Sequence, residues 1–232
     1  MKQLLIIPLV LMSLISSPSW GANFDKGFAA YQSGDFATAL REWTPLAEQG
    51  LAEAQFNLGL MYRRGEGVLQ DDKTAVKWYT LAAEQGYADA QYNLGWMYAN
   101  VNGAPQDDKT AVKWYTLAAE QGLADAQFNL GLMYYNGNGV TQDYKAAVKW
   151  YTLAAEQGDA DAQYNLALMY YNGEGVTQNN VYAHMWWNIA ASNGSKTAAE
   201  NRDIVAKNMT LSQLEKAQDL ARKCVAENYK DC

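Results

Sequence analysis

Residues 51–86 read LAEAQFNLGLMYRRGEGVLQDDKTAVKWYTLAAEQG, and residues 123–158 read LADAQFNLGLMYYNGNGVTQDYKAAVKWYTLAAEQG. Residues 87–122 and 159–194 are further copies of this 36-residue unit, with no gap between consecutive copies. A fixed period in this range is typical of a solenoid, in which each unit buries its apolar face against the next unit. The repeat alone therefore predicts a solenoid.

Each unit contains two predicted helices. In the first copy, apolar residues at helical spacing define one face of the first helix: Ala54, Leu58, Met61 and Tyr62. The second helix has the same kind of face: Ala75, Trp78, Tyr79, Ala82 and Ala83. Gly65 ends the first helix, Asp71 is the expected N-cap of the second, and Gly86 ends the second. The fold class predicted is all-α, a right-handed α/α superhelical solenoid.

The two ends of the chain differ from the repeated middle, as terminal units of a solenoid do. Residues 22–50 form a shortened N-terminal helical unit, in which Pro45 predicts a kink in the second helix. Residues 195–232 are expected to form C-terminal capping helices. Thr210 and Gln213 are spaced as a capping box that opens the last helix.

Residues 1–21 have the order of a secretory signal peptide: Lys2, then an apolar run, then small residues up to Gly21. Cleavage after Gly21 predicts a periplasmic or secreted protein. A membrane anchor is the alternative, but the run is short of the roughly 20 residues that a spanning helix needs. Because this segment contains Lys2 and no acidic residue, its removal changes the net charge from -7 to -8. An acidic chain argues against nucleic acid as a partner, and no stable membrane insertion is expected after cleavage.

Cys224 and Cys232 are the only two cysteines. In an oxidising compartment they can close a short loop at the C-terminus. An intermolecular disulfide and two free thiols are the alternatives.

The motif Ala-x-x-x-Leu-Gly-x-x-Tyr, followed by Gly-x-Gly-Val, Asp-x-x-x-Ala-x-x-Trp-Tyr and Ala-Ala-x-x-Gly, resembles the Sel1-like repeat (SLR) family, relatives of the tetratricopeptide repeat. The resemblance covers residues 51–194, and residues 22–50 look like a tetratricopeptide hairpin. It implies a solenoid that assembles other macromolecules. In the first copy the motif stands at Ala54, Leu58, Gly59, Tyr62, Gly65, Gly67, Val68, Asp71, Ala75, Trp78, Tyr79, Ala82, Ala83 and Gly86.

The tetratricopeptide geometry implies that the first helix of each pair lines the concave face. The stripe opposite its core face is apolar and aromatic, where a solvated face should be polar. Such a stripe predicts a groove that binds a protein or peptide. The alternative is that the stripe packs between repeats as core. The predicted groove residues are Phe56, Leu60, Arg63, Tyr92, Trp96, Phe128, Leu132, Tyr135, Tyr164, Leu168 and Tyr171. An acidic row runs beside them: Glu53, Asp89, Asp125 and Asp161.

Catalytic and metal-binding patterns give no basis for an enzyme. The single histidine, His184, lies in a helix rich in Met and Trp, which favours a structural role. No cofactor and no metal-ligand spacing is recognised. Some cysteine-rich relatives imply penicillin binding or β-lactamase activity, but the Ser-x-x-Lys, Ser-Asp-Asn and Lys-Thr-Gly motifs are missing from this sequence. The predicted function is a protein-binding scaffold or adaptor. A secreted effector for a host protein and a β-lactam or cell-wall hydrolase are the alternatives.

Overall fold

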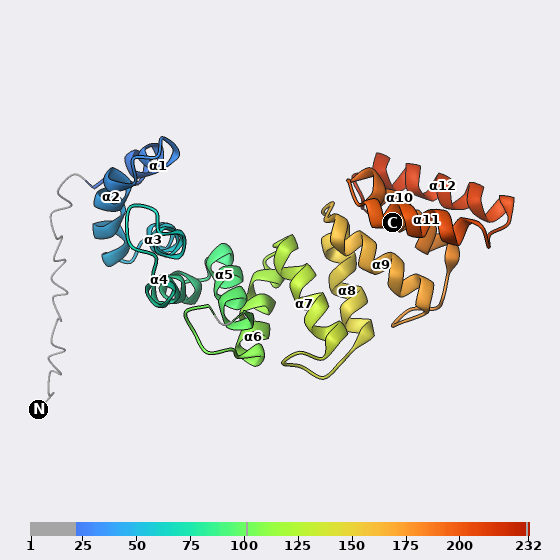
Figure 1. Ribbon diagram of the computed structural model, residues 1–232, viewed down its shortest axis with the longest axis horizontal. Coiled ribbons are helices and arrows are strands. Elements are labelled where there is room, and N and C mark those ends of the chain that lie inside the picture. Colours follow the sequence, from blue (N-terminus) through green and yellow to red (C-terminus); the bar gives the residue numbers. More distant parts are fainter. Residues whose placement is uncertain (1–21, 101, 231) are drawn as a thin grey trace, which may run out of the picture.

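The computed structural model describes residues 22–100, 102–230 and 232, and within them the chain forms twelve α-helices and no strand. The helices follow one another along a curved arc (Figure 1). The all-α solenoid predicted from the repeat is therefore confirmed. The helices are α1 (Phe24–Gln32), α2 (Phe36–Glu48), α3 (Ala52–Arg64), α4 (Asp72–Glu84), α5 (Ala88–Ala99), α6 (Asp108–Glu120), α7 (Ala124–Asn136), α8 (Tyr144–Ala155), α9 (Ala160–Asn172), α10 (Asn180–Ser192), α11 (Lys196–Ala206) and α12 (Leu211–Ala226).

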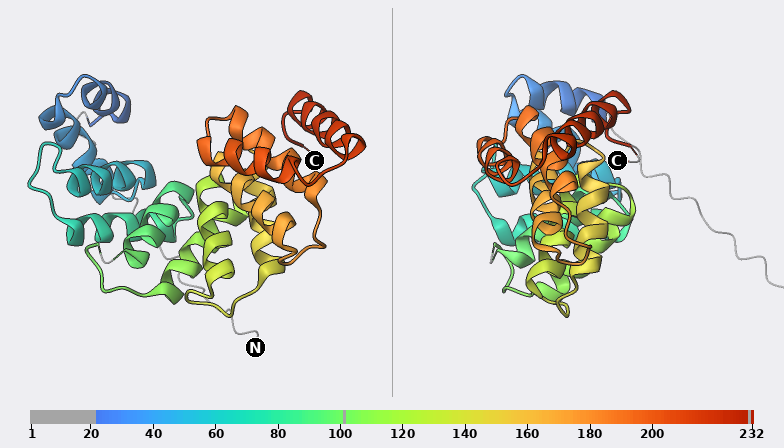
Figure 2. Two further views of the ribbon diagram at one scale, coloured as in Figure 1. Left: turned by 45° about the vertical axis from the view of Figure 1, so that its right-hand side comes forward. Right: turned by 90° about the vertical axis from the view of Figure 1, so that its right-hand side faces the viewer.

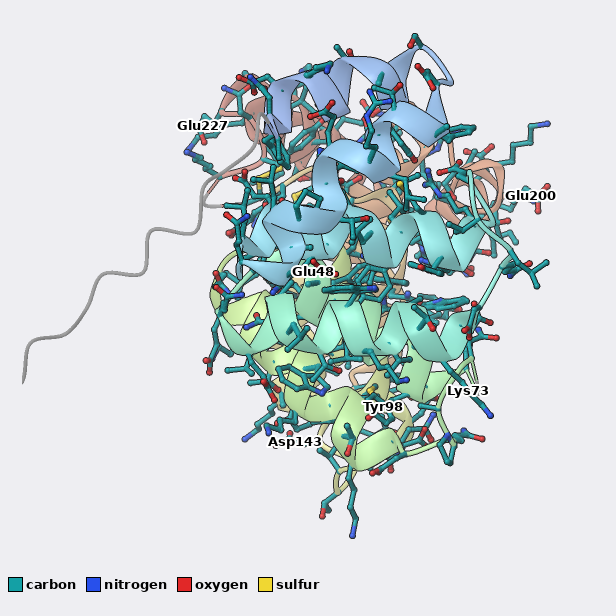
Figure 3. All side chains as sticks on the ribbon, turned by 90° about the vertical axis from the view of Figure 1, so that its left-hand side faces the viewer. Glu48, Lys73, Tyr98, Asp143, Glu200 and Glu227 are labelled. Carbon is teal, nitrogen blue, oxygen red and sulfur yellow. A yellow bond between two sulfur atoms is a disulfide. The ribbon has the colours of Figure 1, made fainter. Side chains whose placement is uncertain are left out.

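Each helix packs principally on the helices before and after it in the sequence, as expected for stacked units. Helices α3 and α5 lie on the inner side of the arc, and α4 and α6 lie on its outer side (Figure 1). A second view shows the same curvature (Figure 2, left). In these two units the first helix therefore faces the concave side. Seen from the α1 end, the units lie one behind another, and charged side chains such as Lys73 and Asp143 point outward (Figure 3).

Helix ends follow the capping chemistry predicted from the sequence. Asp71 and Asp107 accept backbone N–H groups at the starts of α4 and α6. Gly65 ends α3 with φ 71°, a left-handed conformation that glycine adopts without steric cost. The second unit differs, because α5 ends one residue earlier, at Ala99, and Asn100 takes the C-cap position with φ -116°.

A glycine against an aromatic ring sets the close approach of the two helices in each unit. A Cβ at Gly59 would lie 2.6 Å from the ring of Tyr79, and a Cβ at Gly131 would lie 2.7 Å from the ring of Tyr151. No side chain fits at that distance. In the fourth unit the pair becomes Ala167 with Trp187, and both are buried.

A ladder of buried glutamines joins consecutive units. Gln91 is 3% exposed, and its Nε2 donates to the carbonyl oxygen of Ala83 at 3.0 Å while its Oε1 accepts from Gln121 Nε2 at 2.7 Å. A buried amide is tolerated when both ends are hydrogen-bonded in this way. The other positions of the ladder are Gln55, Gln127 and Gln163.

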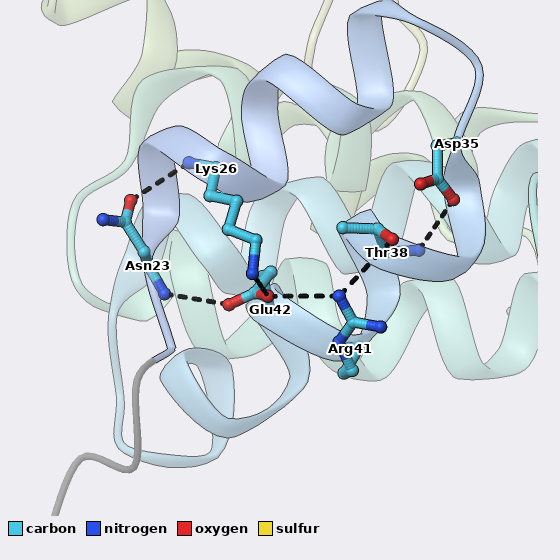
Figure 4. A network of polar contacts seen from close by, with 6 residues as sticks. All are labelled: Asn23, Lys26, Asp35, Thr38, Arg41 and Glu42. Carbon is cyan, nitrogen blue, oxygen red and sulfur yellow. Dashed lines mark hydrogen bonds and ion pairs between the residues drawn. The ribbon is translucent and has the colours of Figure 1, made fainter.

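The N-terminal unit is closed by a polar network around a buried carboxylate (Figure 4). Glu42 accepts from Lys26 Nζ at 2.7 Å and from the backbone N–H of Asn23 at 3.2 Å, and Arg41 lies 3.4 Å away. The bond from Lys26 is the main reason why the pKa of Glu42 is lowered. Helix α2 continues through Pro45 to Glu48, so the proline does not end it.

The C-terminal end is closed by α12, which packs on α10. Its first turn has the predicted capping box between Thr210 and Gln213. Ala217 and Ala221 are buried against the stack, whereas Val225, four residues after Ala221 on the same helical face, is 44% exposed. A disulfide joins Cys224 to Cys232, with a Cα–Cα distance of 5.3 Å, so the last residue is tied back to α12.

The predictions for residues 1–21 lie outside the described residues. Among the helices that the structure describes, none is both long enough and apolar enough to cross a membrane.

Candidate binding groove

Three pockets open between successive first helices on the concave side. A pocket of about 320 Å³ lies between α5 and α7, one of about 110 Å³ between α7 and α9, and one of about 180 Å³ between α9 and α11. Leu132 lines the first two pockets and Leu168 lines the last two, so each leucine forms the ridge between neighbours. The pockets therefore form one continuous row.

The three pockets are built from equivalent positions of the repeat. An aromatic side chain of the second helix lies in each of them: Tyr115, Tyr151 and Trp187. An asparagine of the following first helix lines one wall: Asn129, Asn165 and Asn201. Because Asn201 and Ile204 of α11 stand 36 residues after Asn165 and Leu168, α11 extends the groove as a further first helix.

The junction between α3 and α5 has the same positions but is occupied by a side chain of the chain itself. The guanidinium of Arg63 lies 4.4 Å from the ring centroid of Trp96, within the range of a cation–π contact. Its Nη1 donates to Asn93 Oδ1 at 2.7 Å. Burial raises the pKa of Tyr79 to about 12, and the positive charge of Arg63 opposes part of that rise. Arg63 therefore belongs to the wall of the groove.

The pocket between α5 and α7 is open because Ala99 occupies the position of Arg63. Trp96 and Leu132 form apolar walls. The C-cap residue of α5, Asn100, and Gln106 just before α6 add two amide side chains to the lining. Amide and carboxylate groups make up the remaining polar lining: Asp108, Asn129, Asn136 and Asn138. The lining of this pocket is therefore predominantly polar, with Trp96 and Leu132 as its apolar walls.

The predicted groove residues divide into those that pack on rings of the second helices and those that line the pockets. Ten of the eleven are partly buried, and Tyr171 is 36% exposed. The inner part of the stripe packs on second-helix rings: Phe56 on Tyr79, Tyr92 on Tyr115, and Phe128 on Tyr151. The outer part lines the three pockets: Trp96, Leu132, Tyr135, Leu168 and Tyr171. Leu60 is partly buried, and Tyr164 accepts a hydrogen bond from Asn201.

Exposed carboxylates accompany the first helices. The acidic row Glu53, Asp89, Asp125 and Asp161 is exposed at the first turns of α3, α5, α7 and α9. Tyr135 donates to Glu174 Oε2 at 3.2 Å, and burial followed by this carboxylate raises the pKa of the Tyr135 hydroxyl. These carboxylates add negative charge to the face of the first helices.

His184 lies away from the groove. It is 4% exposed on α10, and burial lowers its pKa, with the charge of Arg202 lowering it further. A buried neutral imidazole of this kind fits packing rather than proton transfer.

Two recurring polar positions, one in the groove and one between units, were not predicted from the sequence. The asparagines that line the pockets occupy one position of every unit, and the buried glutamines of the ladder occupy another. A polar residue type that recurs at one position of each copy is the signal that indicates both.

The fold and the groove define a repeat solenoid with an internally repeated concave surface. The Sel1 repeat model matches residues 52–87, 88–123, 124–159 and 160–195, each range beginning one residue after the start of a 36-residue unit. The chain belongs to the Sel1 repeat family. Proteins of this family are generally non-catalytic scaffolds for protein–protein interaction.

Two solved structures are similar to this chain. A protective antigen present in uropathogenic Escherichia coli strains, displaying an SLR fold, is 36% identical with a TM-score of 0.80, and the match covers 89% of this chain and 46% of that one. This chain thus spans less than half of that antigen. A Sel1 repeat protein from Oxalobacter formigenes is 31% identical with a TM-score of 0.77, and the match covers 85% of each chain. No curated protein matches the chain.

Proposed function

We propose that this protein is a scaffold that binds another protein in the groove from α5 to α11, and that it acts in the periplasm or outside the cell. The observation that carries the proposal is the row of three pockets with equivalent linings. A row of sites at regular spacing suits an extended segment, because such a segment presents side chains at regular spacing as well.

An extended peptide presents side chains at regular intervals along its length. Successive side chains of such a segment can enter successive pockets of the row, with Leu132 and Leu168 between them.

The location rests on two observations of different kinds. Residues 1–21 have the pattern of a signal peptide. The disulfide between Cys224 and Cys232 belongs to an oxidising compartment. An envelope adaptor and a secreted effector both satisfy these conditions, and the compartment in which a partner is captured separates them.

The test is site-specific photo-crosslinking in the producing cells, with benzoylphenylalanine in place of Leu132 or Leu117. Leu132 forms a ridge of the groove, whereas Leu117 lies on α6 outside the three pockets and is 37% exposed. We expect adducts with a defined protein at position 132 and none at position 117. Equal labelling at both positions, or no adduct at position 132 in cells and medium, would contradict groove binding.

A further inference from the structure

The junction between α3 and α5, which Arg63 occupies, and the open pocket between α5 and α7 are equivalent sites one repeat apart. The first is filled by a side chain of the protein itself, and the second is open. Arg63, Tyr79 and Asn93 surround the first. Their equivalents 36 residues later are Ala99, Tyr115 and Asn129, which line the second. What fills the first site therefore indicates what the second can hold.

The first site holds an arginine side chain. Its guanidinium donates to the Oδ1 of Asn93, and this asparagine is oriented by its own Nδ2, which donates to the carbonyl oxygen of Asp89 at 2.8 Å. The orientation turns the amide oxygen toward the cation.

The second site repeats this orientation without the arginine. Asn129 Nδ2 donates to the carbonyl oxygen of Asp125 at 3.0 Å, so its Oδ1 corresponds to the acceptor that Arg63 uses. Ala99 ends at Cβ and leaves the pocket of about 320 Å³. The carboxylate of Asp108, which lines this pocket, adds a negative charge.

We propose that the pocket between α5 and α7 binds an arginine side chain of a cationic segment of the partner. The aliphatic stem lies between Trp96 and Leu132, as long cationic side chains do on apolar walls. The guanidinium donates to Asn129 Oδ1 and pairs with Asp108. The acidic row on the first turns draws the segment in. This inference rests on the proposed function and specifies the chemistry of its ligand.

The test uses the purified protein and four peptides, acetyl-Gly-Ser-Gly-Xaa-Gly-Ser-Gly-amide with Xaa as Arg, Lys, citrulline or Glu. Citrulline keeps the shape of arginine and removes its charge. Binding at millimolar peptide is followed by NMR through the indole N–H of Trp96 and the side-chain amide of Asn129. We expect the Arg peptide to bind at least about tenfold more tightly than the citrulline peptide. Equal affinities, stronger binding of the Glu peptide, or no binding of the Arg peptide would overturn the proposal.

Two variants with opposite expected effects make the test independent of folding defects. Ala99→Arg places an arginine in the pocket as Arg63 does one unit earlier, and should lower Arg-peptide affinity about tenfold or more. Asn138→Asp adds a carboxylate to the lining of the pocket and should raise the affinity several-fold. Leu117→Arg is the matched control, because it adds an arginine at an exposed position of α6 that lines none of the three pockets. Unchanged affinity in Ala99→Arg, or weaker binding in Asn138→Asp, would contradict the assignment.

The failure of this inference can be distinguished from failure of groove binding. If the Ala99→Arg variant still forms the adducts at position 132, the groove binds its partner without an arginine anchor, and only the present inference is wrong. If the unmodified groove gives no adduct at position 132, the proposed function itself is wrong.

Discussion

The interior of the stack and the surface of the groove differ in how strictly the repeat is kept. In the first three units, the glycine–tyrosine contacts and the bonds of the glutamine ladder recur with nearly the same distances. In the groove, the position of Arg63 becomes Ala99, Tyr135 and Tyr171 in the later units. The interior contacts are thus kept while the groove surface varies, although the aromatic side chains Tyr115, Tyr151 and Trp187 belong to both.

The largest effect is expected from an interior aromatic. Tyr115 is 2% exposed and packs against Gly95, where a Cβ would lie 2.9 Å from its ring. Tyr115→Ala should lower the free energy of unfolding by about 3–5 kcal/mol, the usual range for truncating a buried aromatic. Urea denaturation measures this loss, with the exposed Lys113→Ala as control. A cost similar to that of the control would show that the interior does not carry the stability.

The glutamine ladder should have the next largest effect. Gln127→Leu removes the bond from its Nε2 to Ala119 and the bond that its Oε1 accepts from Gln157. Two buried hydrogen bonds contribute about 2 kcal/mol in total. Gln91→Leu should cost about the same by urea denaturation, because its two bonds are equivalent. Very different losses at the two positions would mean that the ladder is not a repeated interaction.

A groove variant should cost much less stability. Arg63→Ala removes one hydrogen bond and one cation–π contact from a partly exposed site, which corresponds to about 1 kcal/mol.

The double variant Trp96→Ala with Tyr135→Ala should weaken partner binding and leave the protein folded, as judged by circular dichroism and crosslinking yield. Unfolding of that double variant would place these side chains in the core.

The smallest effect on stability is expected when acid protonates the N-cap carboxylates. The side chains of Thr74 and Thr110 donate to Asp71 and Asp107 and lower the pKa of both carboxyls from 3.8. Because the folded pKa is depressed, this stabilisation is present above pH 3.8 and is lost as the pH falls through the lowered pKa. Melting temperatures of Asp71→Asn and Asp107→Asn should fall less steeply with acid than that of the unmodified protein. Parallel curves would show that the caps do not contribute to acid sensitivity.

The repeat and its capping residues made most of the fold predictable from sequence. The period, the N-cap Asp71 and the C-terminal capping box each depend on local chemistry, which a sequence shows directly. The stripe on the first helices was located, because helical periodicity assigns a face. Whether Val225 would be buried depended on how α12 approaches α10, and the sequence carries no local signal for that.

The pockets were not predictable in the same way, because each depends on residues from two neighbouring units. Arg63 fills a space bounded by Asn93 and Trp96 of the next unit, and Ala99 opens the equivalent space one unit later. Arg63 and Ala99 stand at the same position of the repeat, so helical periodicity predicts the same exposed fraction for both side chains. The difference arises from side-chain volume across a contact between units.

The glutamine bonds between units each connect residues 8 positions apart, regardless of which two units meet. Any unit can therefore follow any other without leaving a buried amide unpaired. The second helices at residues 73–86 and 109–122 are identical, which favours unequal recombination between copies of the coding sequence. A gain or loss of 36 residues would lengthen or shorten the row of pockets by one and leave both sealed ends unchanged. The number of pockets in the row therefore changes in evolution by whole repeats of 36 residues.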